Sequence, residues 1–474
     1  MPPARQADVL RWPVIGAFLR WRHARTSLQL VVLLITATLV AHGLFGSQIG
    51  PRNLATVVTW VHYRGLLVIA LLAAGNLFCT GCPFVLVRDV GRRVRQPWLR
   101  WPHRLRTKWI GILLFVSVLF IYELFDLWAL PRGTALLVLA YFGAALSVDL
   151  VFAGATFCKY LCPIGQFNFV ASTVSPLALQ VRQPETCRTC RTFDCIKGRP
   201  ETNQRGCELG LFLPAKIGSL DCTFCLDCVQ ACPHDNVALA VGVPGAELLD
   251  LRRRSGIGRL TERWDVATLT VLFAFGGLLN AFAMTAPVLD LERWLARVMG
   301  STSEAPVLAV LFVVALGAVP LAALGGAAAV TRHLTRPTSY SVGQIAVRYA
   351  CALVPFGFGV WLAHYGFHLL TGGLTIIPVA QSAIIEVVGW AALGAPMWQW
   401  TGMQPGAVFP IQLGFILLGS IGSLALSYLI SERDYPDRPV FAAAPWLGVV
   451  LVLAAAAVWI LSQPMEMRGL GLSG

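Results

Sequence analysis

Long apolar runs alternate with short arginine-rich stretches along most of the chain. Runs of about twenty apolar residues are long enough to cross a bilayer as helices, which satisfy their own backbone hydrogen bonds. Such runs lie at about 27–46, 56–78, 109–130, 134–156, 265–286, 306–329, 345–370, 407–430 and 441–462. The pattern therefore predicts an all-α polytopic membrane protein.

One further apolar stretch, at 373–395, is ambiguous because it contains Pro378, Gln381 and Glu386. If it crosses the membrane, the protein has ten transmembrane helices, and if it lies at the surface, the protein has nine. Three tryptophans within residues 390–400 suit a membrane interface. We therefore favour a non-spanning or re-entrant segment within an overall count of nine to ten transmembrane helices.

Composition and charge indicate where the protein resides. The chain is 56% hydrophobic and 13% charged, whereas a soluble domain is about one-quarter charged. The net charge of +13 comes from basic residues beside the apolar runs, where they orient the helices, so we expect no nucleic-acid partner. The arginine-rich loop at 79–108, the N-terminus and residue 157 should face the cytoplasm. Rare lysine and common arginine suggest a GC-rich bacterial genome, and with the apolar runs we expect a multi-pass protein of the bacterial inner membrane.

Residues 157–262 interrupt the apolar pattern and hold ten of the thirteen cysteines. The stretch is polar and contains no run that could cross the membrane. We expect three domains: a four-helix membrane domain at 1–156, a cytoplasmic ferredoxin-like iron–sulfur insert at 157–262, and a membrane domain of five to six helices at 263–474.

The strongest motif in this insert is CTFCLDCVQACP. Its spacing, C-x2-C-x2-C-x3-C-P, is that of bacterial [4Fe–4S] ferredoxins, in which the fourth cysteine serves a different cluster. The motif cysteines are Cys222, Cys225, Cys228 and Cys232. Zinc is the main alternative, although zinc sites usually combine one C-x2-C pair with a distant second pair. A disulfide framework is disfavoured on a reducing cytoplasmic face.

A looser set of cysteines precedes this motif, with the spacing C-x2-C-x4-C-x11-C. By the crossing rule, one [4Fe–4S] cluster would use Cys187, Cys190, Cys195 and Cys232, and the second would use Cys207, Cys222, Cys225 and Cys228. All eight cysteines of these two motifs are then used as ligands. A zinc site or a structural cysteine set remains the alternative for this first half.

Two cysteine pairs lie at the ends of apolar runs and each is followed by proline: Cys79 with Cys82, and Cys158 with Cys162. Both pairs should emerge at the same membrane level, because the two runs are similar in length. The four thiols could form a third metal centre, or they could be free thiols or a reversible dithiol. Cys351, inside an apolar run, should be a small packed hydrophobe.

These residues resemble the NapH, NosR and CcoG group of polyferredoxin-type membrane proteins. The stretches YRGLLVIALLAAGNLFCTGCPF and TFCKYLCPIGQFNF carry the likeness, which covers roughly residues 55–240. The large C-terminal membrane half and the loose first cysteine set also resemble FesM, a membrane iron–sulfur protein of cyclic electron flow. The resemblance implies electron transfer between quinone-linked carriers and other redox partners.

Ionisable side chains inside apolar runs are functional candidates, because they are costly in a bilayer. The runs at 56–78 and 109–130 carry His62, Arg64, Glu123 and Asp126 at comparable depths, which suits either a quinone pocket or a structural ion pair.

Two further histidines, His364 and His368, share one helical face. A quinone site, a metal site and ordinary interface histidines are all consistent with this spacing. There is no C-x-x-C-H sequence for covalent haem, no P-loop and no dinucleotide fingerprint.

We therefore expect a membrane-bound iron–sulfur electron-transfer protein. It would pass electrons between a cytoplasmic redox partner, such as a ferredoxin-like protein or a cytochrome, and the quinone pool or another membrane redox complex. The alternative is a maturation factor that supplies electrons to a client metalloenzyme. The sequence leaves open whether the protein acts as an enzyme itself. A transporter is disfavoured, because no inverted repeat or paired broken helices are evident.

Overall fold

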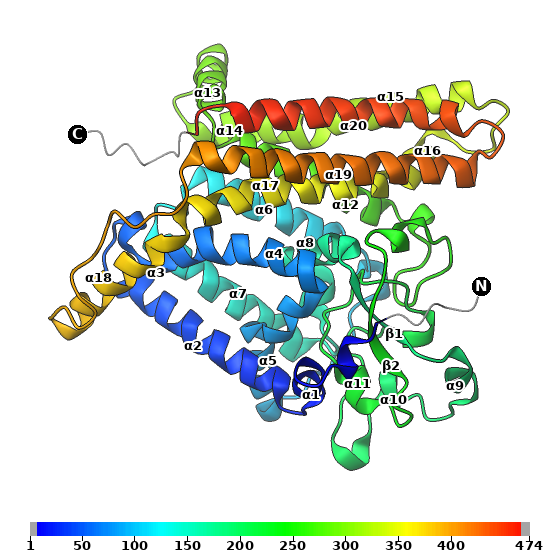
Figure 1. The fold of residues 1–474 in the computed structure, drawn as a ribbon, viewed down its shortest axis with the longest axis horizontal. Coiled ribbons are helices and arrows are strands. Elements are labelled where there is room, and N and C mark those ends of the chain that lie inside the picture. The colour runs from blue at the N-terminus through cyan, green and yellow to red at the C-terminus, as the bar shows by residue number, and fades with distance from the viewer. Residues whose placement is uncertain (1–6, 466–474) are drawn as a thin grey trace. The chain divides into compact units, whose positions relative to one another are not determined.

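The computed structural model describes residues 7–465 and has the helical architecture of a polytopic membrane protein (Figure 1). Within these residues, eight segments are long and apolar enough to cross a membrane: Ala24–Phe45, Leu54–Val94, Pro131–Val151, Trp264–Phe282, Glu304–Leu334, Val342–Val388, Pro405–Asp434 and Pro439–Ser462. Helix α6, Trp109–Leu124, is apolar but shorter. The total of nine to ten transmembrane helices stays a prediction.

The chain folds into two compact units that interleave along the sequence. The first unit includes the chain up to Thr36, together with Ala70–Phe115 and Ala140–Val266, and the second comprises Ala37–Ile69, Val116–Leu139 and Ala267 onward. Residues of both units occur in helices α2 (Ala24–Phe45), α4 (Arg64–Ala74), α6 and α7 (Pro131–Val151).

The first unit holds twelve of the thirteen cysteines, and most of its own elements are short. They are helices α1 (Ile15–Arg20), α5 (Pro83–Val94), α8 (Pro163–Ala171), α9 (Pro184–Thr189), α10 (Asp194–Lys197) and α11 (Asp227–Ala231), and strands β1 (Leu177–Val181) and β2 (Val237–Val241). The strands pair antiparallel, with Leu179 opposite Leu239. Both leucines are buried in a core that also contains Phe224 and the thiols of Cys222 and Cys228.

The second unit consists of helices. They are α3 (Leu54–Val57), α12 (Trp264–Phe282), α13 (Ala286–Met299), α14 (Glu304–Val313), α15 (Val319–Leu334), α16 (Val342–Ala350), α17 (Val354–Gly372), α18 (Ile376–Val388), α19 (Pro405–Asp434) and α20 (Pro439–Ser462). Helices α17, α19 and α20 run alongside one another (Figure 1). Gly359 and Gly419 allow α17 and α19 to approach closely, since a Cβ on either would lie 2.6 Å from a carbonyl oxygen of the facing helix.

Helix α18 falls within the ambiguous stretch at 373–395. Its 13 residues extend over about 20 Å, which is less than the roughly 30 Å of a bilayer's hydrocarbon core. At its C-terminal end, Glu386 accepts a hydrogen bond from the Ser47 amide (3.0 Å) and lies 3.3 Å from His42 Nε2. The length of α18 therefore favours the non-spanning interpretation.

Candidate functional site

Four cysteines of the first unit line one small cavity. Its other lining residues include Leu179, Leu209, Leu211, Leu213 and Lys216. We call its cysteines the inner set: Cys207, Cys222, Cys225 and Cys228. The cavity thus combines four sulfur donors with a largely apolar wall, as an iron–sulfur cluster requires.

The loop that carries the inner set is tightly wound. Asp221, Phe224 and Leu226 adopt left-handed backbone angles, with φ of 62°, 50° and 63°. Non-glycine residues rarely do so, and each costs about 1–3 kcal/mol. The repeated reversals turn three motif cysteines towards the same cavity, so the strain serves to gather the thiols.

Burial raises the pKa of the inner-set thiols of Cys207, Cys225 and Cys228. Their neighbours within the set raise the pKa values further, because four thiolates repel one another. The Leu211 amide donates a hydrogen bond to Cys207 Sγ (3.4 Å). A metal centre would remove the cost of gathering these thiolates, so the donor set fits such a group.

The outer set, Cys187, Cys190, Cys195 and Cys232, lies around a different point of the same unit. Asn236 links its two ends, since its amide donates to Cys232 Sγ (3.4 Å) and its side chain donates to Cys187 Sγ (3.3 Å). Burial, followed by Cys232, Cys187 and Cys190, raises the pKa of Cys195. Cys232 therefore lies with the upstream cysteines rather than with the rest of its own motif.

The backbones that carry the two sets lie next to each other, but the thiols of the two sets form separate groups. The Cys207 amide donates to the Cys195 carbonyl (2.9 Å), although the two side chains belong to different sets. In residues 7–465, no three His, Cys, Asp or Glu side chains converge on a single metal ion. Thiolates can hold either a zinc ion or an iron–sulfur cluster, so the choice between the two stays a prediction.

The remaining pairs, Cys79 with Cys82 and Cys158 with Cys162, share one local structure; we call them the membrane pairs. Cys82 caps α5 and Cys162 caps α8, and a proline occupies the first turn of each helix. Burial raises the pKa of Cys162 to about 12, with Cys82 among the contributing neighbours. Burial also raises the pKa of Cys158, to which Asp149, Cys162 and Cys82 add. The structure thus brings the two pairs together.

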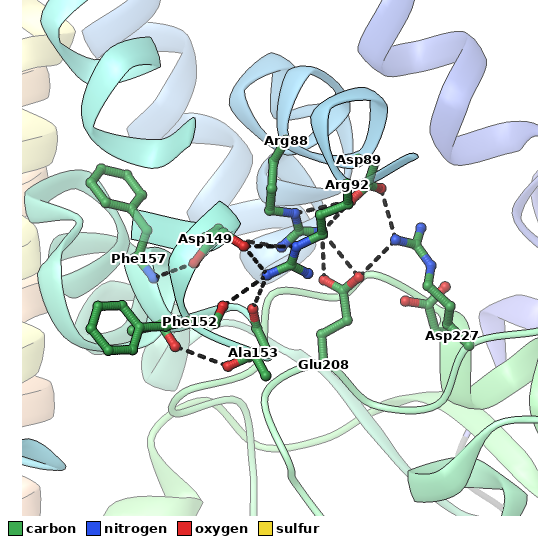
Figure 2. Close-up of polar contacts among 12 residues, drawn as sticks. Arg88, Asp89, Arg92, Asp149, Phe152, Ala153, Phe157, Glu208 and Asp227 are labelled. Atoms are coloured by element: carbon green, nitrogen blue, oxygen red, sulfur yellow. Dashed lines mark hydrogen bonds and ion pairs between the residues drawn. The ribbon is translucent and has the colours of Figure 1, made fainter. Parts of the chain in front are cut away.

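A buried ion-pair network, drawn in Figure 2, includes Asp149 and Arg88, which interact electrostatically with Cys158 of these pairs. Arg88, whose side chain is 1% exposed, lies 2.7 Å from carboxylate oxygens of both Asp89 and Glu208 and 3.6 Å from Asp149. Figure 2 shows its guanidinium between Asp149 and Glu208, which come from separate segments. Burial alone would raise the pKa of Glu208, but Arg88, Arg25 and Arg205 lower it to about 2.

This network connects several cysteine motifs. Glu208 follows Cys207 directly, and Asp227, which Arg25 binds at 3.0 Å, precedes Cys228. Asp149 accepts a hydrogen bond from the Phe157 amide (2.9 Å), one residue before Cys158. The sequence indicated Arg88 only as part of a basic loop that orients the membrane helices. The charged residues directly beside Cys207 and Cys228 are the sequence feature from which such a network could have been predicted.

In the second unit, Arg64 lies in an aromatic cage. Its guanidinium carbon is 4.3 Å from the ring centre of Trp60, 4.1 Å from that of Tyr122 and 4.9 Å from that of Tyr365. Glu123 is buried and accepts a hydrogen bond from Asn280 (3.1 Å). The ion pair of Arg64 with Glu123 or Asp126 stays a prediction.

The three candidate histidines differ in their surroundings. Both ring nitrogens of His62 face backbone carbonyls, those of Val57 (3.1 Å) and Gly373 (2.9 Å), so His62 joins two segments. The rings of His364 and His368 meet edge to face at 4.9 Å. His364 is fully buried, and neither of its ring nitrogens has a hydrogen-bond partner among the described residues.

Comparisons with known proteins give partial matches. The chain is 30% identical to the Putative electron transport protein YccM of Escherichia coli, over 21% of this chain and 25% of that protein. It is 29% identical to the Regulatory protein NosR of Pseudomonas aeruginosa, over 35% and 24%. It is 26% identical to the Ferredoxin-type protein NapH of Escherichia coli, over 35% and 63%. The chain therefore spans less than two thirds of each of these three relatives.

These relatives confirm the resemblance to the NapH/NosR group over about a third of the chain, and they indicate a membrane protein of electron transfer. No protein-family model matches the chain, and no solved structure matches it significantly. The narrower likeness to FesM stays a prediction.

Proposed function

We propose that the protein holds two [4Fe–4S] clusters and passes electrons between a soluble redox partner and the quinone pool or another membrane redox complex. One cluster would bind the inner set and the other the outer set. The thiol-bearing part and the N-terminus would face the cytoplasm of a bacterium, with the helices in its inner membrane. The observation that carries this proposal is the cavity lined by four cysteines from two separate segments.

The chemistry lies in the clusters, which accept and release single electrons, and the protein sets their position and potential. Leu209, Leu211 and Leu213 exclude water from the inner set. Amide donors to sulfur, from Leu211 in the inner set and Asn236 in the outer set, favour the reduced form of a cluster. The less buried outer set suits exchange with a soluble partner.

A quinone would bind in the second unit, near His364, His368 and Arg64. A buried histidine without hydrogen-bond partners is unusual in proteins, and a quinone carbonyl could accept a hydrogen bond from it. We expect His364→Leu to lower quinol oxidation in proteoliposomes without changing the iron content, whereas the exposed His333→Leu should leave both unchanged. Loss of iron in His364→Leu would contradict this assignment.

Anaerobic electron paramagnetic resonance (EPR) of dithionite-reduced protein tests the clusters. We expect a cubane signal from each of the two sets in the unsubstituted protein, and Cys222→Ser and Cys187→Ser should each remove one of them. Cys351→Ser, which alters a thiol outside both sets, is the matched control and should keep both signals. Zinc in place of iron, with no cubane signal, would refute the proposal.

A further inference from the structure

We propose that the membrane pairs bind a third iron–sulfur cluster of the [4Fe–4S] type, which exchanges electrons with the inner-set cluster. This inference rests on the proposed function, because its electron donor or acceptor is the inner-set cluster. The four ligands would be Cys79, Cys82, Cys158 and Cys162.

The first step is the matching geometry of the two pairs. In each, the second cysteine caps a helix whose first residue is proline. At the second of these caps, Cys162 Sγ accepts a hydrogen bond from the Gly165 amide (3.2 Å). A helix N-terminus and an amide donor both favour a thiolate, which is the form that binds metal.

The second step is the meeting of the two pairs. Asn168, on the helix that follows Cys162, donates its side-chain amide to Cys79 Sγ at 3.3 Å. Asn168 is fully buried, so its amide is held against the sulfur of the other pair. Cys162 also packs in one core cluster with Cys158 and with Phe84, which lies two residues after Cys82. The two pairs therefore lie next to each other.

The third step is charge. A buried site that holds four thiolates needs positive charge nearby, because uncompensated buried charge is costly. Arg88 interacts electrostatically with Cys82 and Cys158, and Arg25 interacts with Cys82. Both arginines are already paired with carboxylates, so they offset only part of the charge of four thiolates, whereas the irons of a cluster would offset most of it. The alternative of four packed, protonated thiols gives no role to the amide donors at Cys79 and Cys162.

The fourth step is the connection to the inner set. The 3₁₀ segment Gly75–Gly81 carries Cys79 and docks on the inner-set loop. Asn76 donates to the Cys222 carbonyl (2.8 Å), and Thr80 donates to the Phe224 carbonyl (2.7 Å). Both side chains are at most 1% exposed. Gly75 has φ of 60°, and a Cβ there would lie 3.0 Å from Ser175 Oγ, so glycine suits this close approach.

When both clusters are bound, a single electron would pass between the centre held by the inner set and the centre held by the membrane pairs. One cluster would lose the electron that the other gains, so no bond would form or break and no proton would be required.

Metal and sulfide analysis of the full-length protein, purified anaerobically in detergent, tests the inference. Three clusters would give about twelve irons and twelve sulfides per chain, and two would give about eight of each. We expect about twelve irons in the unsubstituted protein and about eight in Cys79→Ser and in Cys162→Ser. Cys351→Ser, a thiol in the second unit, is the matched control and should keep all twelve.

The iron content of the unsubstituted protein tests the third cluster even if a variant cannot be purified. About eight irons per chain, with or without one copper or zinc, would overturn the third cluster and leave the two-cluster proposal standing. Fewer than about eight irons would contradict the proposed function itself. A count of twelve that does not fall in a well-folded Cys79→Ser protein would also overturn the assignment of these ligands.

Discussion

The inner and outer sets have the same four-cysteine composition but different surroundings. Two inner-set cysteines, Cys222 and Cys228, are 8% and 9% exposed and lie among leucines, and the other two are partly exposed, whereas all four outer-set cysteines are partly exposed. Exposed Arg188, Arg191 and Phe193 flank the outer set. Burial separates the two roles, because the set near the surface can reach a soluble partner while the buried set is insulated from water.

The ion pairs beside the two sets differ most in their burial, so we expect the largest difference in stability when these pairs are broken. Arg88→Gln leaves Glu208 and Asp149 with reduced compensation inside the protein, which should cost about 3–5 kcal/mol of stability. Arg188→Gln breaks an exposed pair with Glu185, 74% exposed on both sides, and should cost little. Thermal unfolding in detergent, followed by tryptophan fluorescence, measures both. Equal losses would contradict the buried role of Arg88.

The second-largest effect should be a difference between the two clusters in their stability in air. Oxidants reach a partly exposed cluster more readily, so the outer-set EPR signal should disappear several-fold faster than the inner-set signal after exposure to oxygen. Replacing Leu211 with Ser would open the inner cavity and should reduce the difference. Time-resolved EPR of samples frozen after air exposure follows both signals. Faster loss of the inner-set signal would reverse our comparison.

A smaller effect should follow from the hydrogen bonds to sulfur. Asn236→Leu removes the side-chain donor to Cys187 and keeps the backbone donor to Cys232. The reduced cluster loses a favourable interaction, so the outer-set midpoint potential should fall. A redox titration monitored by EPR measures this shift, and the inner-set potential in the same sample is the internal control. An unchanged outer-set potential would exclude Asn236 as a tuning residue.

The smallest effect should concern docking. Exposed cations next to the outer set, Arg191 and Lys197, suit an acidic electron carrier. Arg191→Glu should slow reduction by such a carrier a few-fold at low salt, and the difference should shrink at high ionic strength. Arg253→Glu, an exposed site outside this loop, is the charge-matched control. Stopped-flow kinetics provide the rates, and equal rates for both variants would argue against docking there.

The cysteine spacing predicted two four-thiol sets, and their use as ligands stays a prediction. In the structure, Cys207 lines one cavity with Cys222, Cys225 and Cys228, and Asn236 donates to both Cys187 and Cys232. The long apolar runs likewise predicted most helices. Asn236, Asn168 and Arg88 could not be recognised, because their partners are far away in the chain and only folding brings them together. Arg88 also lies among arginines that the membrane pattern already explained.

The central claim is that the two clusters exchange their fourth ligands, and the variants Cys232→Ser and Cys207→Ser test it most directly. EPR of the reduced proteins, with Cys222→Ser and Cys187→Ser as references for the inner and outer signals, distinguishes the assignments. We predict that Cys232→Ser loses the same signal as Cys187→Ser, and that Cys207→Ser loses the same signal as Cys222→Ser. The opposite pattern, with Cys232→Ser matching Cys222→Ser, would contradict the crossed arrangement.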